Sequence, residues 1–245
     1  MAEKLKSILK RTNWSSLLRA VIFAAAWWAT PFISFWVFLL VALYLYFVPF
    51  TGAEKVSVPF FVLLLISFLQ GNSILAAVIF GAIFYFIILI KDLLIIDRRS
   101  AYDILVLVLS YLLIRNFFLR VGGSLEGWTV VYSLVAAGAV SGMVTSFIKN
   151  FSTAWTEADS PEARSFRRML GWMTFLLMWQ LLLVGLFLPL DFLYQSAIIF
   201  LVAVIMIDLL PQYIFGELSR TKVLVTGMVL FALVTIVATS ARWVL

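Results

Sequence analysis

The chain has 245 residues, of which 64% are hydrophobic and 12% are charged, and its formal net charge is +6. Soluble domains carry about 45–50% apolar and roughly 25% charged residues, so a water-soluble fold of this composition would expose large apolar patches. Cysteine and histidine are absent, which excludes disulfides, Cys/His zinc sites, His-ligated haem and an imidazole base. We therefore expect an all-α integral membrane protein, and the sequence indicates no cofactor and no metal site.

The amino-terminal residues 1–15 are basic and contain an apolar helical face. Leu5, Ile8 and Leu9 share that face, and lysines lie opposite it. This pattern is typical of an amphipathic helix that lies on a membrane surface. We expect residues 1–15 to be interfacial.

Two long apolar stretches follow, 17–49 and 58–90, and each is interrupted near its middle, at Thr30-Pro31 and at Gly71-Asn72. As a single helix, each stretch would be about 50 Å long, too long for a hydrocarbon core of ~30 Å. Proline removes an amide donor and disfavours helix at the residue before it. We predict two helical hairpins, which pair 17–30 with 32–49 and 58–70 with 73–90.

The rest of the chain is a series of apolar blocks joined by short loops. A spanning helix needs about 20 apolar residues, and blocks of about that length occupy 73–90, 103–119, 128–148, 168–190, 192–214 and 222–243. The sequence thus predicts a polytopic helical bundle of nine membrane helices, or of seven if each hairpin is one kinked helix. We expect one membrane domain, 1–245, with residues 149–167 as a cytoplasmic loop.

The basic residues orient the helices. With the N-terminus inside, the inner side receives all 18 Lys and Arg residues except Arg115, Arg120 and Arg242, which is a strong positive-inside bias. The C-terminus is then outside, as expected for a protein of a cell membrane such as the bacterial inner membrane. The bias is similar for seven crossings, so charge does not decide the count.

Three arginines, Arg164, Arg167 and Arg168, share one face of a helix predicted to begin at Pro161 after an N-cap at Ser160. Near a membrane surface each basic residue attracts anionic headgroups by about 1 kcal/mol. Ordinary positive-inside anchoring explains the same residues more simply. Anionic lipid headgroups on the inner face are the expected partners; nucleic acid is not.

Asp208 is the most notable polar residue inside a predicted membrane helix. Pro211 frees a carbonyl near it, and Gln212 lies one turn further on the same face. A carboxylate, an amide and a free carbonyl can together bind a proton or a cation. The alternative, which we favour, is a structural ion pair with a cation of a neighbouring helix, for which the candidates are Arg168, Lys149 and Lys91.

Two further polar residues and one small-residue motif lie within predicted helices. Gln180 is expected to bond a neighbouring helix rather than a substrate. Arg115 is expected to extend to the outer surface, with docking of an anion as the alternative. Gly138 and Gly142 form a small-xxx-small face, which predicts close contact with another helix of the bundle, or less strongly a dimer.

Three functions remain open at this point. The scarcity of catalytic residue types and the very small loops favour a non-catalytic subunit or scaffold of a membrane or envelope assembly, with other membrane proteins as partners. The matching interruptions of the two apolar stretches suggest a carrier for a small or lipophilic substrate, with Asp208 as the ion- or proton-coupling residue. An intramembrane enzyme would need clustered carboxylates, for which Asp92, Asp97 and Asp103 are the candidates near the inner boundary.

Overall fold

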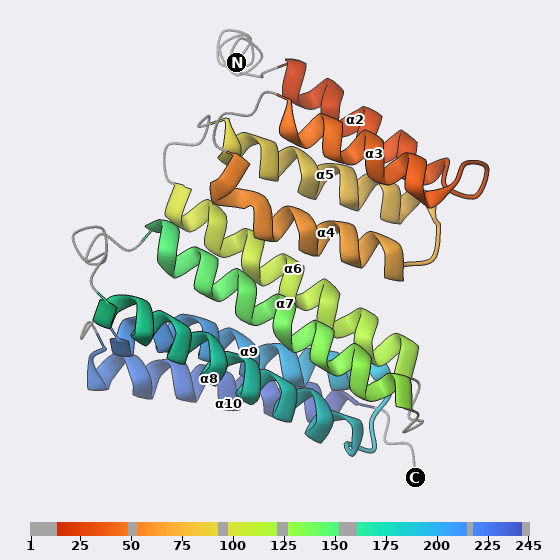
Figure 1. Cartoon of the computed structure of the whole chain (residues 1–245). Coiled ribbons are helices and arrows are strands. Elements are labelled where there is room, and N and C mark those ends of the chain that lie inside the picture. The colour runs from red at the N-terminus through yellow and green to blue at the C-terminus, as the bar shows by residue number, and fades with distance from the viewer. Residues whose placement is uncertain are drawn as a thin grey trace, which may run out of the picture. The chain divides into compact units, whose positions relative to one another are not determined.

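The computed structural model describes residues 14–48, 53–92, 98–121, 127–151, 161–214 and 218–241. Within these ranges the chain forms nine α-helices, α2 to α10, with one short 3-10 helix and no β-strand (Figure 1). Nearly all of the predicted interfacial segment, and residues 152–160 of the predicted loop, lie outside the described residues. The all-helical prediction is confirmed for the part of the chain that is described.

The helices group into two compact units, residues 1–105 and 106–245. Each unit has its own buried core and is described below by itself. The expectation of one membrane domain stays a prediction.

The first unit consists of two helical hairpins, as predicted. The first pairs α2 (Trp14–Trp28) with α3 (Phe35–Phe47), and the second pairs α4 (Ser57–Leu69) with α5 (Ile74–Lys91), preceded by the 3-10 helix η1 (Ala53–Val56). Ring contacts join residues on the two sides of each turn: Phe23 lies 5.3 Å from Phe38, and Phe60 lies 6.0 Å from Phe84, between ring centroids. Both interrupted stretches are therefore folded back on themselves.

Polar side chains at the two turns pair with backbone groups that the helices leave free. Ser34 and Ser73 are N-caps, and their hydroxyls accept hydrogen bonds from the amides of Trp36 and Ala76. Asn72 Nδ2 donates to the carbonyl of Trp28 at 2.8 Å, so the turn of the second hairpin is joined to the end of α2. Asn72 thus links the two hairpins as well as forming a turn.

The core of the first unit is aromatic and tightly packed. Phe23 stacks on Phe84 with ring centroids 4.2 Å apart, and Trp27 contacts the edge of Phe80 at 4.9 Å. The indole Nε1 of Trp27 also donates to the carbonyl of Ser67 at 3.0 Å. These contacts connect α2 to both helices of the second hairpin.

The second unit contains the last part of α6 (Arg98–Val121) together with α7 (Gly127–Phe151), α8 (Pro161–Leu186), α9 (Phe192–Ile214) and α10 (Arg220–Ser240). α8 begins at Pro161, as predicted. It ends at Leu186 rather than at residue 190, since Pro189 cannot continue the ladder of backbone hydrogen bonds.

Two glycines of α8 allow close approach by its neighbours. A Cβ on Gly185 would lie 2.6 Å from Phe118 Cζ and 2.8 Å from Ile199 Cγ1, so α6 and α9 both contact α8 there. A Cβ on Gly171 would lie 3.0 Å from Thr145 Cγ2 of α7, and Ser141 Oγ donates to the Gly171 carbonyl at 2.7 Å. The contact between α7 and α8 therefore depends on Gly171.

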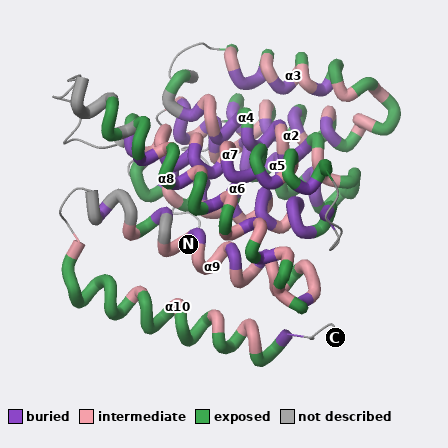
Figure 2. The backbone as a smooth tube through the Cα atoms, turned by 60° about the horizontal axis from the view of Figure 1, so that its bottom comes forward, coloured by how far each residue is buried: buried purple, intermediate pink, exposed green. Residues whose placement is uncertain are grey.

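Six helices, α5 to α10, are long and apolar enough to cross a membrane. α3 and α4 have 13 residues each, which corresponds to about 20 Å of helix, shorter than a hydrocarbon core of ~30 Å. These lengths and compositions are those of an integral membrane protein. Figure 2 shows that α10 differs from the other long helices, because almost none of its length is coloured as buried.

Gly81 of α5 offers a test of the core of the first unit. A Cβ on Gly81 would lie 2.8 Å from the Cβ of Ala24 on α2, so Gly81→Ala forces the two helices apart. We expect Gly81→Ala to lower the stability of the detergent-solubilised protein by about 1–3 kcal/mol, measured by thermal unfolding. Gly227→Ala on α10 is the matched control, because nothing lies within 4 Å of its Cβ position. Equal melting temperatures for the two variants would contradict this packing.

Candidate functional site

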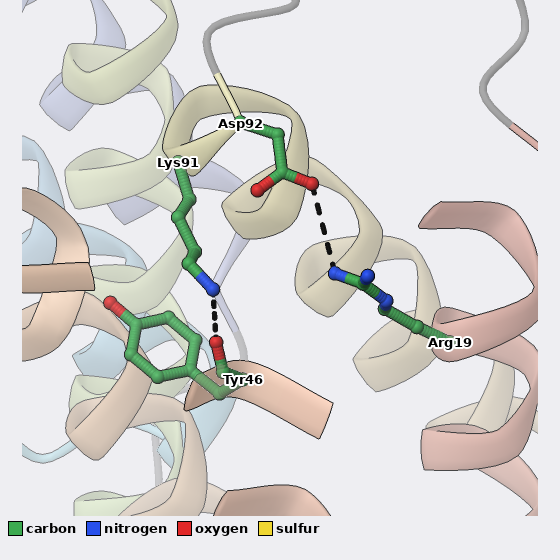
Figure 3. Close-up of polar contacts among 4 residues, drawn as sticks. All are labelled: Arg19, Tyr46, Lys91 and Asp92. Carbon is green, nitrogen blue, oxygen red and sulfur yellow. Dashed lines mark hydrogen bonds and ion pairs between the residues drawn. The ribbon is translucent and has the colours of Figure 1, made fainter. Parts of the chain in front are cut away.

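Four charged and polar residues meet at one end of the first unit (Figure 3). Lys91 is the last residue of α5, and Asp92 is the C-cap of the same helix. Arg19 lies on α2, and Tyr46 lies one residue before the end of α3. Three helices thus bring charged or hydrogen-bonding groups together at this end, which the positive-inside pattern predicts to be the cytoplasmic side.

Lys91 is buried, with 2% of the residue exposed. Its Nζ donates to the backbone carbonyl of Tyr46 and lies 5.1 Å from the centroid of the Tyr46 ring. The Tyr46 carbonyl is among the last four of α3, which have no partner within a helix. A cation at this position satisfies that carbonyl and interacts favourably with the helix dipole and with the aromatic ring. Lys91 therefore fastens the end of α3 to the end of α5.

Arg19 and Asp92 form an ion pair between α2 and α5, with Nη1 of Arg19 at 3.8 Å from Oδ2 of Asp92. The side chains are 21% and 17% exposed, respectively, so the pair is only partly shielded from its surroundings. A separation of 3.8 Å is too long for a hydrogen bond. The two charges attract each other, but Nη1 of Arg19 does not donate a hydrogen bond to Asp92.

The cluster itself was not predicted, although two of its members were expected in other roles. Lys91 was one of three alternative partners for Asp208, and Asp92 was one of the carboxylates of a possible enzyme site. In the structure Lys91 bonds Tyr46 and Asp92 faces Arg19, all within the first unit. The predicted hairpins could have indicated this cluster, because they bring the start of α2 and the ends of α3 and α5 to the same end of the unit.

Asp208 is exposed on α9, and its carboxylate accepts a hydrogen bond from Gln212 Nε2 at 2.7 Å. Gln212 is itself buried, and its Oε1 has no hydrogen-bond partner among the described residues. Two of the predicted ion-pair partners, Lys149 and Arg168, are exposed, and within the described ranges no ion pair joins them to Asp208. The structure thus brings Asp208 and Gln212 together, on one helix.

The other two polar candidates are not part of this pair. Gln180 is exposed on α8 and has no hydrogen-bond partner in the described part of the chain. The bond that it is expected to make to a neighbouring helix stays a prediction. Arg115 is partly exposed on α6. Beside it, Asn116 is 1% exposed, and neither atom of its amide group has a partner within the described residues.

The structure describes only some of the side chains predicted to pack helices or to bind headgroups. A Cβ on Gly138 would meet Phe175 of α8 at 3.9 Å, an ordinary contact, and Gly142 is partly exposed on α7. Arg168 is exposed near the start of α8, whereas the side chains of Arg164 and Arg167 lie outside the described part. The roles expected of these residues, in helix packing and in headgroup binding, stay predictions.

Comparison with known proteins adds no assignment: no family model, no curated protein and no solved structure matches this chain.

Lys91→Met tests whether the buried cation holds the helix ends together. The substitution keeps an unbranched side chain but removes the donor to the Tyr46 carbonyl, which would leave a buried acceptor unpaired. We expect a loss of about 1–3 kcal/mol in unfolding free energy, measured by thermal unfolding in detergent. Lys222→Met, at an exposed position of α10, removes the same charge and should leave the melting temperature nearly unchanged. If both variants melt like the parent protein, Lys91 has no structural role.

Proposed function

We propose that the chain is a multi-pass protein of a cell membrane that serves as a non-catalytic subunit or scaffold of a membrane assembly. The observation that carries the proposal is α10. This helix is long and apolar enough to cross a membrane, yet none of its residues is buried. A spanning helix with so little packing inside its own chain has most of its surface available for a helix of another membrane protein.

Exposure along α10 shows which side faces the rest of the unit. Five residues of α10 are partly buried and recur mostly at intervals of three or four: Thr226, Leu230, Val234, Val237 and Ala238. Residues spaced in this way lie on one face of a helix, and α9 is the helix that α10 contacts. This face therefore lies against α9.

The opposite face of α10 carries six exposed residues, Val225, Met228, Ala232, Thr235, Ile236 and Thr239. Three of them, Ala232, Thr235 and Thr239, have small side chains. The hydroxyls of Thr235 and Thr239 donate to carbonyls of their own helix, those of Phe231 and Thr235, at 2.7 and 2.8 Å. Small residues allow two membrane helices to approach closely, whereas lipid chains need no such surface. The composition of this face supports a protein partner.

The two alternatives find less support in the geometry. A carrier with Asp208 as its coupling residue would require groups from several helices, and the only hydrogen-bond partner of Asp208 among the described residues is Gln212 on the same helix. An intramembrane enzyme would use carboxylates held together, and within the described residues no three of His, Cys, Asp and Glu are grouped closely enough to bind a metal ion. The scaffold is therefore the function that we propose.

The proposed topology has nine crossings, with the N-terminus inside and the C-terminus outside, in a membrane such as the bacterial inner membrane. The two hairpins of the first unit support the larger count, since each apolar stretch reverses direction at its interruption. The basic residues support the orientation. The short helices α3 and α4 would then need a locally thinned bilayer or polar residues that extend to the interface.

Cross-linking from α10 tests the proposed partner. Because the chain has no cysteine, Thr235→Cys introduces a single thiol, which a photoactivatable thiol reagent can label in native membranes. We expect a cross-linked product with one polypeptide of defined mass, several-fold stronger than from Val234→Cys on the face toward α9. Adding Ala232→Leu to the Thr235→Cys variant should reduce the product, because the larger side chain blocks close approach. A protein that gives only lipid adducts and purifies as a monomer without partners would contradict the scaffold.

Labelling at residue 55 tests the crossing count. With nine crossings Lys55 is on the inner side, whereas with seven it is on the outer side. In intact cells or sealed right-side-out vesicles, Lys55→Cys should resist a membrane-impermeant maleimide and should react only after permeabilisation. Arg120→Cys, expected on the outer side in both arrangements, is the positive control. Rapid labelling of Lys55→Cys from outside would exclude the nine-crossing topology.

A further inference from the structure

Two buried hydrogen-bond donors lie one turn apart on α2. Ser16 is 1% exposed, and its hydroxyl has no hydrogen-bond partner among the described residues. Nη1 of Arg19 is also buried and also lacks a hydrogen-bond partner there. Residues three apart are neighbours on a helix surface. Leaving two such donors unpaired is unfavourable, so this position favours a ligand that carries acceptor oxygens.

The charges nearby favour an anion. Of the four residues in Figure 3, Arg19 and Lys91 are basic and Asp92 alone is acidic. The Lys91 ammonium is turned toward the Tyr46 carbonyl, whereas the guanidinium of Arg19 is too far from Asp92 for a hydrogen bond. One positive charge is thus left in excess, which matches the single negative charge of a phosphate diester. Guanidinium groups bind phosphate with well-oriented, charge-assisted hydrogen bonds.

The surface beside Arg19 favours a lipid as the source of that phosphate. Leu18 precedes Arg19 and is 61% exposed, and Ile22 lies one turn further along α2 and is 40% exposed. Arg19 is therefore at the edge between the buried face of α2 and its apolar outer face. A phosphate held by Arg19 would have this apolar strip next to it, where an acyl chain can lie.

We propose that Ser16 and Arg19 form a binding site for the phosphate of an anionic phospholipid at the inner end of α2, with an acyl chain along Leu18 and Ile22. The Ser16 hydroxyl and the Arg19 guanidinium donate to the phosphate oxygens. Asp92 holds the guanidinium in place but repels the ligand. The site is separate from the α10 surface, and it does not depend on the scaffold function.

The test measures the binding of defined lipids to the full chain in neutral detergent, by native mass spectrometry and by the shift in melting temperature. Phosphatidylglycerol should bind saturably and raise the melting temperature, whereas phosphatidylcholine and inorganic phosphate should do so much less. Arg19→Gln should weaken phosphatidylglycerol binding by about ten- to a hundredfold, and Ser16→Ala by about three- to tenfold. Arg99→Gln, at an exposed arginine of α6, should bind like the parent.

Asp92→Asn separates a ligand site from a purely structural ion pair. If the phosphate binds Arg19, removing the carboxylate should leave phosphatidylglycerol binding unchanged or tighten it, while Arg19→Gln weakens it. If Arg19 serves only to pair with Asp92, both variants should lower stability equally and neither should change lipid binding, which would overturn the proposal. Equal stabilisation by inorganic phosphate would overturn the assignment to a lipid. If Arg19→Gln does not fold, Ser16→Ala and Asp92→Asn still decide, because both keep the Arg19 side chain and the Lys91–Tyr46 bond in place.

Discussion

The main constraint on this molecule is that hydrocarbon offers no hydrogen bonds. Every backbone amide and carbonyl within the membrane must find its partner inside the protein, and a helix achieves this within one segment. The difficulty moves to the helix ends, where groups remain free. At the turns of the first unit, Ser34 and Ser73 cap helices and Asn72 bonds the Trp28 carbonyl. The few polar side chains near the turns are thus placed where the helices cannot satisfy their own backbone.

The same constraint accounts for the cluster at the opposite end of the first unit. A buried ammonium would be very unfavourable in an apolar core. Lys91, however, is next to a helix-end carbonyl and an aromatic ring, so its charge has favourable contacts. Arg19 and Ser16 differ from Lys91 because their buried atoms have no acceptor within the described residues. Since other polar groups near the helix ends of this unit are paired, the two unpaired donors support the proposed phosphate ligand.

The sequence predicted the helices well, since Pro or Gly lies shortly after the ends of α4, α6 and α8. The expected segment 73–90 corresponds to Ile74–Lys91, and the interruptions at Thr30-Pro31 and Gly71-Asn72 are both turns. The candidate site was harder, because Lys91 and Tyr46 are 45 positions apart and no local pattern connects them. The glycines show the same limit. The motif at Gly138 and Gly142 was visible, but Gly81, Gly171 and Gly185 have the closest neighbours, and a motif does not tell which helix lies opposite.

The function of a membrane helix is harder to predict than its fold, because the surface that contacts lipid and the surface that contacts another protein are both apolar. An exposed leucine on a membrane helix is equally well covered by an acyl chain or by another helix, so hydrophobicity alone cannot distinguish them. What distinguishes them is the size of the side chains on each face, once the structure shows which face is already used. On α10 three small residues, Ala232, Thr235 and Thr239, recur at intervals of three and four on the face away from α9, beside the larger Val225 and Ile236. Small residues weaken contact with lipid and allow close backbone contact with a helix, so their position away from α9 favours a second chain.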